Sequence, residues 1–139
     1  MKLNKNQLKI IDNICRKSRL DFVRVFGSAA TSKKPRDIDL AIGTKPLTLA
    51  LNSRFIAAME KVFKKDIDVV HLKPGLSPTL VLEIAKNSKP IWEKEDVGRS
   101  RYADLIDRLV AIAQDERLSF PKELRIESAK RVHRRLRVT

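Results

Sequence analysis

The 139-residue sequence has little cysteine, histidine or glycine, and each scarcity excludes a class of site. The one cysteine, Cys15, cannot form an internal disulfide, and with only two histidines it does not supply the ligands of a structural zinc site. The four glycines do not form a Walker-type phosphate loop or a dinucleotide-binding fingerprint. This cysteine usage leads us to expect a reducing, cytoplasmic location.

The sequence also lacks a long apolar run. No uninterrupted apolar stretch approaches the roughly 18 residues that span a bilayer, and no apolar segment follows the charged residues 1–6. We therefore expect neither membrane insertion nor secretion. With 42% hydrophobic residues, the chain can still bury the core of one ordinary domain.

Positive charge is abundant, with 30 Lys and Arg against 17 Asp and Glu and a net charge of +13. The excess is concentrated at the ends of the chain. Residues 1–20 carry six cations and one anion, residues 21–98 carry thirteen and ten, and residues 99–139 carry eleven and six. Such an excess favours a partner that carries negative charge, although basic ends are also typical of a solvated surface.

The spacing of apolar residues predicts a mixed α+β chain. Helices are expected at residues 4–18, 48–64, 100–116 and 122–137, with a shorter one opened by Pro78. Strands are expected at residues 21–26, 37–42, 66–71 and 90–93. A short loop separates the first two strands, which are therefore expected to pair as a hairpin.

The polar stretch Glu95–Gly98 is the best candidate for a domain boundary. We predict a folded domain over residues 1–97 and a helical basic extension over residues 98–139. Three interpretations of the basic tail stay open: a solvated helix, a surface that follows RNA phosphates, or an arm that docks on an acidic protein. The sequence does not indicate an oligomeric state.

Three carboxylates are placed to act together. Asp37 and Asp39 are two residues apart on a predicted strand, so both point to one face while Ile38 and Leu40 point to the other. Asp68 has the same setting on a later strand. Converging carboxylates repel one another unless a cation neutralises them, and Mg²⁺ prefers carboxylate oxygens together with waters and substrate phosphates.

A Gly-Ser turn ends the first predicted strand, just before this carboxylate pair. Gly27 leaves room for a phosphate to approach the backbone, and Ser28 offers a hydroxyl and an N–H to hold it. A lone Gly-Ser or a lone Asp-x-Asp is weak, because either occurs in ordinary turns and strand entries. The order of strand, Gly-Ser, short loop, Asp-x-Asp strand, helix and Asp strand is much more specific.

This ordered set, Phe26–Ala30, Asp37–Leu40 and Asp66–Val70, resembles the DNA polymerase beta-like nucleotidyltransferase superfamily. The resemblance covers roughly residues 5–95, and the size of the matching region resembles that of the minimal nucleotidyltransferases. It implies a polymerase beta-like nucleotidyltransferase fold, in which flanking helices cover a mixed β-sheet.

The resemblance also implies a role for each site residue. Gly27 and Ser28 match the turn that holds the nucleotide phosphates, and Asp37 and Asp39 match the carboxylates that bind two Mg²⁺ ions. Asp68 matches the third carboxylate, which completes the metal site and helps to activate the acceptor hydroxyl. Asp66 lies on the same face as Asp68 but is the poorer match, because the family's third carboxylate lies inside the strand.

The loop after the turn departs from the family pattern. Thr31 and Ser32 stand where an Arg and a Gly are usual, and only eight residues separate the turn from Asp37. Positive charge for a triphosphate could come instead from Lys33, Lys34 and Arg36, although a charged loop can also be simply solvated.

The function implied by the resemblance is Mg²⁺-dependent transfer of a nucleotidyl group from a nucleoside triphosphate, with AMP from ATP as the expected case. The acceptor would be a hydroxyl of a protein or an RNA. In such families the common setting is the antitoxin of a toxin–antitoxin pair, with a partner toxin as the protein acceptor. The alternative is a catalytically weak module of the same fold that binds RNA or a protein through its basic surfaces.

Overall fold

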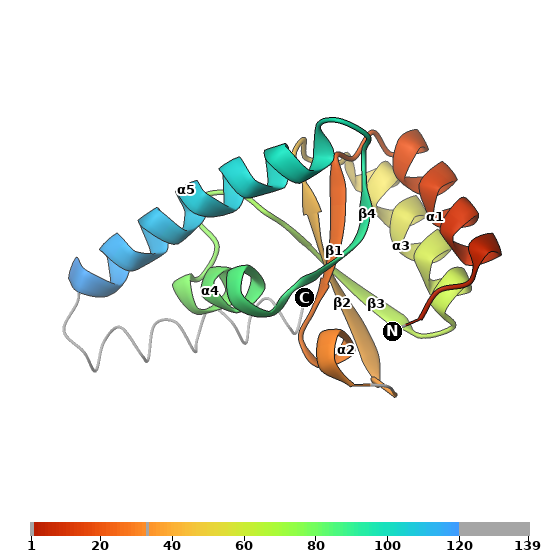
Figure 1. Ribbon diagram of the computed structural model, residues 1–139, viewed down its shortest axis with the longest axis horizontal. Helices are drawn as coiled ribbons and strands as arrows, with labels where there is room; N and C mark the ends of the chain where they lie inside the picture. Colours follow the sequence, from red (N-terminus) through yellow and green to blue (C-terminus); the bar gives the residue numbers. More distant parts are fainter. Residues whose placement is uncertain (1, 33, 120–139) are drawn as a thin grey trace.

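The computed structural model describes residues 2–32 and 34–119, which fold as a β-sheet flanked by helices (Figure 1). In chain order the elements are α1 (Lys5–Lys17), β1 (Phe22–Phe26), α2 (Ser28–Thr31), β2 (Asp37–Gly43), α3 (Leu49–Phe63), β3 (Asp66–His71), α4 (Pro78–Asn87), β4 (Lys89–Glu93) and α5 (Gly98–Ser119). Within these residues, no helix is both long and hydrophobic enough to cross a lipid bilayer.

The sheet formed by the described residues has the strand order β3-β2-β1-β4. β1 is antiparallel to both β2 and β4, while β2 and β3 are parallel. The hairpin expected between the first two strands is therefore confirmed, as is the mixed α+β fold class. Parallel pairing of β2 with β3 requires a crossover, which α3 supplies.

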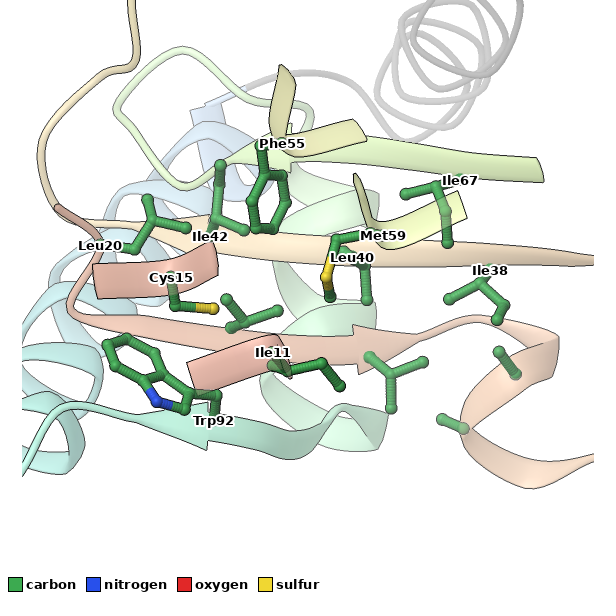
Figure 2. Packing of buried hydrophobic residues seen from close by; sticks show 14 residues of the cluster. Ile11, Cys15, Leu20, Ile38, Leu40, Ile42, Phe55, Met59, Ile67 and Trp92 are labelled. Carbon is green, nitrogen blue, oxygen red and sulfur yellow. The ribbon is translucent and has the colours of Figure 1, made fainter. Parts of the chain in front are cut away.

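One face of the sheet packs against α1 and α3 (Figures 1 and 2). The alternating apolar residues of β2 point into this core together with residues from the other strands and both helices. Its fully buried side chains include Ile11, Cys15, Leu20, Ile38, Leu40, Ile42, Phe55 and Met59. This core holds β2 rigidly and so fixes which of its residues point to the opposite face.

The opposite face packs against α4 and α5 over part of its length. Phe22 and Ala41 lie in this second core, and Phe22 meets the ring of Tyr102 from α5 edge-on at 5.2 Å between centroids. The apolar side of α5, including Leu105 and Leu109, is buried in the same cluster. The helix that begins at Gly98 thus contributes directly to the core of the sheet.

Capping residues explain where the expected helices begin. Asn4 caps α1 in a reciprocal capping box with Gln7, Thr48 caps α3, and Ser77 caps α4, which has Pro78 in its first turn. The expected helices over residues 4–18, 48–64 and 100–116 are confirmed with small shifts at their ends. The helix expected over residues 122–137 lies outside the described residues.

One element was not expected. The sequence predicts a tight turn at Gly27 and Ser28 followed by a polar loop, whereas the chain forms the single helical turn α2. Ser32 N–H donates to the carbonyl of Ser28 at 2.7 Å and closes this turn. Ala29 and Ala30 are buried against β1 and β2, so packing stabilises a helix too short to stand alone.

Candidate active site

Four aspartates from two neighbouring strands lie on one face of the sheet. In the parallel pairing of β2 with β3, Asp37 is opposite Asp66 and Asp39 is opposite Asp68. Neighbouring strands lie about 4.8 Å apart, so each registered pair brings two carboxylates onto adjacent strands. Asp37, Asp66 and Asp68 are exposed and Asp39 is half-buried. The arrangement concentrates negative charge at the end of the sheet where β2 begins.

The Gly-Ser turn lies directly beside the second of these carboxylates. Phe26, the last residue of β1, pairs with Asp39, and the next residue, Gly27, begins the turn. Gly27 has φ +68° and ψ −151°, and a Cβ added to it would lie 2.6 Å from Oδ2 of Asp39. The close approach of the turn to this carboxylate therefore requires glycine, for a reason additional to the phosphate access expected from the sequence.

The candidate phosphate-binding residues surround the same end of the sheet. Ser28 is exposed at the start of α2, and Arg36 is exposed immediately before Asp37. Figure 1 shows α2 beside the start of β2, at the bottom of the view. Lys33, the fourth residue expected to bind nucleotide, lies outside the described residues.

Sequence reasoning missed one cation at this site, Lys65. Its Nζ donates to the carbonyl of Pro35 at 2.7 Å, which ties the entry of β3 to the entry of β2. Asp66 follows it and pairs with Asp37, so this acidic residue also lies closer to the predicted metal pair than expected. The sequence does hold a signal for them: aligning the Asp-Ile-Asp segment at 37–39 in parallel with the one at 66–68 places Lys65 and Asp66 at the site.

The donor chemistry of this face suits a hard divalent cation. Asp37, Asp39 and Asp68 offer only carboxylate oxygens, the ligands that Mg²⁺ and Ca²⁺ prefer. Among residues 2–32 and 34–119, no three acidic, imidazole or thiol side chains form a group that could already hold a metal ion. The backbone register thus brings the right ligands to one face, and ion binding would require their carboxylates to turn toward one another.

Comparison with solved structures finds the same fold elsewhere. A chain of a toxin–antitoxin crystal structure with AMP-PNP aligns with a TM-score of 0.59 at 22% identity, over 84% of this chain and 94% of that one. A complex of tri-AMPylated HEPN toxin from Shewanella oneidensis with MNT antitoxin gives a TM-score of 0.64 at 16% identity, over 92% and 99%. A structure described as a minimal nucleotidyltransferase gives 0.52 at 26% identity, over 63% and 91%.

Comparison at the level of sequence finds the family. No curated protein matches the chain significantly. The family model for polymerase beta nucleotidyltransferases matches residues 8–97, which include the Gly-Ser turn and every aspartate of the site. These residues are most of the described chain, and the mixed sheet agrees with the fold that the resemblance implied. The chain belongs to the polymerase beta nucleotidyltransferase family.

Proposed function

We propose that this protein transfers AMP from ATP to a hydroxyl of a partner toxin protein, in a reaction that depends on a divalent metal, and thereby acts as an antitoxin. The observation that carries the proposal is the register of Asp37 with Asp66 and of Asp39 with Asp68, beside the turn at Gly27. Two similar structures support the setting: one holds a toxin–antitoxin pair with AMP-PNP, and the other a tri-AMPylated toxin with an antitoxin.

Three of the carboxylates share one task in this reaction, and Asp68 has a second. Asp37, Asp39 and Asp68 would hold the metal, with two Mg²⁺ ions as the expected number. When bound, Mg²⁺ neutralises phosphate charge and lowers the pKa of the acceptor hydroxyl. The Asp39 carboxylate lies in the space that a Cβ at Gly27 would take, so this glycine lets the turn approach the metal ligand closely. Asp68 is exposed beside it on β3 and is the nearest base for the proton that the hydroxyl loses.

The reaction itself is a displacement at the α-phosphorus. The acceptor oxygen forms a bond to that phosphorus, the bond to the bridging oxygen of the β-phosphate breaks, and pyrophosphate leaves with the electron pair. Ser28, through its hydroxyl and N–H, would hold the phosphates in line for this attack, and Arg36 and Lys33 would offset their charge. These residues position the triphosphate, while the aspartates act where bonds change.

Metal binding can be tested without knowing the acceptor. We expect Mg²⁺ to raise the melting temperature of the purified protein, because an ion that binds only the folded chain contributes about 2.7 kcal/mol at a hundred times its Kd. The double variant Asp37→Asn/Asp39→Asn should lose this shift. The matched control Asp104→Asn/Asp107→Asn, with the same charge change on exposed positions of α5, should keep it. A shift that survives in the first variant would contradict the metal assignment.

Transfer is tested with α-labelled nucleoside triphosphates, Mg²⁺, and either the product of the neighbouring gene, as the candidate toxin, or total RNA. We expect label from ATP on the toxin, reduced by about a thousandfold or more in Asp37→Asn/Asp39→Asn, because a catalytic metal contributes several kcal/mol to the transition state. Label on RNA alone would overturn the protein acceptor. Label on neither, with tight salt-sensitive RNA binding, would favour the alternative of a binding module of this fold.

A further inference from the structure

Five basic side chains line one cavity at the opposite end of the sheet from the carboxylates. This hollow has a volume of about 320 Å³ and is lined by residues from the end of α1, the end of β4 and the start of α5. Figure 1 shows these three parts of the chain close together at the top of the view. β2 runs from one end to the other, so its seven residues separate the two regions by about 20 Å. The charged residues that line the hollow are Arg16, Arg19, Asp21, Lys45, Lys94 and Arg101.

A buried carboxylate fixes one of the guanidinium groups. Asp21, with a side chain only 6% exposed, accepts from Nη1 of Arg101 at 3.0 Å and from the Thr44 N–H at 3.3 Å, as well as from the Thr44 hydroxyl. Burial raises the pKa of Asp21, but the hydrogen bonds from Thr44 and Arg101 and the charge of Arg101 outweigh it and keep this pKa below its ordinary value. Arg101 remains 48% exposed, so the rest of its guanidinium is available to a ligand.

A second guanidinium is fixed on the other side of the hollow. Arg16 binds Asp12 at 3.0 Å and also pairs with Glu95, and its guanidinium carbon lies 6.0 Å from the centre of the Trp92 ring. Trp92 Nε1 donates to Oδ1 of Asp12 at 2.8 Å, which holds that carboxylate in place. Arg16 also remains 42% exposed. Both arginines are therefore oriented before any ligand arrives.

Three further cations face the hollow without an acidic partner. Arg19, Lys45 and Lys94 make no ion pair with any residue of the part of the chain that the structure describes. The first turn of α5 contains no acidic residue, so the positive end of that helix is not offset from within it. Five cations at the hollow thus stand against the three carboxylates that bind Arg16 and Arg101, which leaves an excess of two positive charges.

We propose that this hollow binds a compact ligand with two or three linked phosphate groups, at a site separate from the carboxylates. The negative charge of such a group suits the three unpaired cations. The N–H groups that Arg16 and Arg101 do not use for their carboxylate partners can donate to its phosphate oxygens. The volume lies at the lower end of the range of small-molecule sites. The cations converge from several elements on one cavity instead of forming a stripe, which favours a compact group over a nucleic-acid strand.

The proposal does not depend on the function proposed for the aspartates, and its test removes that site. Tripolyphosphate and ATP are titrated separately, by calorimetry in the presence of EDTA, into a protein that carries Asp37→Asn/Asp39→Asn. We expect one site for each. Adding Arg19→Gln/Lys45→Gln/Lys94→Gln should weaken binding by about tenfold or more, since three partly exposed charge pairs are lost. Equal affinities would show that the phosphates alone are recognised, and tighter ATP binding would add a contribution from the nucleoside.

A matched control separates a site from general attraction to a basic protein. Arg54→Gln/Lys61→Gln/Lys86→Gln removes the same number and kinds of charges from exposed helical positions outside the hollow. It should leave both affinities within about twofold. Equal weakening by the two triple variants, equal binding of the tricarboxylate citrate, or no binding in the parent protein would each overturn the proposal. Far-UV circular dichroism and melting temperature confirm that each variant is folded.

Discussion

Gly27→Ala is the substitution that best separates the site from the fold. Gly27 has φ +68° and ψ −151°, a conformation that residues with a Cβ adopt only at a cost of about 1–3 kcal/mol. The new methyl group would also lie 2.6 Å from Oδ2 of Asp39. That oxygen is at the end of a side chain that can rotate, so the contact is relieved by moving the carboxylate rather than the backbone. The variant should therefore fold with Asp39 displaced.

Gly75→Ala is its matched control. Gly75 also has a positive φ, +100°, but a Cβ there would have nothing within 4 Å. Both variants should thus lose about 1–3 kcal/mol of unfolding free energy from backbone strain. Only Gly27→Ala moves a site carboxylate, and a displacement of about 1 Å can cost about a hundredfold in rate. We expect that loss of nucleotidyl transfer in Gly27→Ala, and close to wild-type transfer in Gly75→Ala.

Urea denaturation measures the stability of the two variants, and the α-labelled ATP assay measures their transfer rates at temperatures where both are folded. The Mg²⁺-dependent rise in melting temperature gives a second readout that does not need the acceptor. If Gly27→Ala keeps both the rate and the Mg²⁺ effect of the wild type, the closeness of the turn to Asp39 has no part in the site. The same conclusion follows if Gly75→Ala loses transfer to the same extent.

Two further predictions concern buried ionisable groups. Because the pKa of Asp21 is depressed on folding, its contribution to stability is present above the unfolded value and lost as the pH falls through the folded value. Asp21→Asn should therefore have a lower unfolding free energy than the wild type at neutral pH. As the pH falls below about 4, the unfolding free energy of the variant should decrease less than that of the wild type. Urea denaturation across this pH range measures both, and the same dependence on pH in the two proteins would contradict the assignment. Burial raises the pKa of the Cys15 thiol and covers it, so iodoacetamide should alkylate the native protein about a thousandfold more slowly than the unfolded protein. Mass spectrometry measures the two alkylation rates, and comparable rates would show that α1 is not packed as described.

The strands and long helices could be predicted because the periodicity of their side chains agrees with their burial. Alternation over residues 37–42 places Ile38 and Leu40 in the core and Asp37 and Asp39 on the other face, as the structure has them. The single turn α2 could not be predicted in this way. Its sequence is that of an ordinary polar turn, and its stability comes from Ala29 and Ala30 packing against β1, which precedes it, and β2, which follows later in the chain.

Only part of the site could be predicted, because local spacing does not determine which strands pair. Spacing alone puts Asp37 and Asp39 on one face, whereas the neighbours of that pair depend on strand pairing. Only the parallel register of β2 with β3 places Asp66 opposite Asp37, and Lys65 reaches Pro35 as a consequence. A local pattern cannot distinguish this pairing from an antiparallel one, since the crossover through α3 decides it.

The distribution of charge along the sheet explains why the basic hollow is invisible in the sequence. The five cations come from four separate segments of the chain, so no local pattern brings Arg16 and Arg19 together with Lys45, Lys94 and Arg101. They converge because β1 begins, and β2 and β4 end, at the same end of the sheet, while the aspartates lie where β2 and β3 begin. One antiparallel hairpin therefore separates an acidic region from a basic one. Under the two proposals, a metal ion would neutralise the first region and a phosphate ligand the second, each at its own end of the sheet.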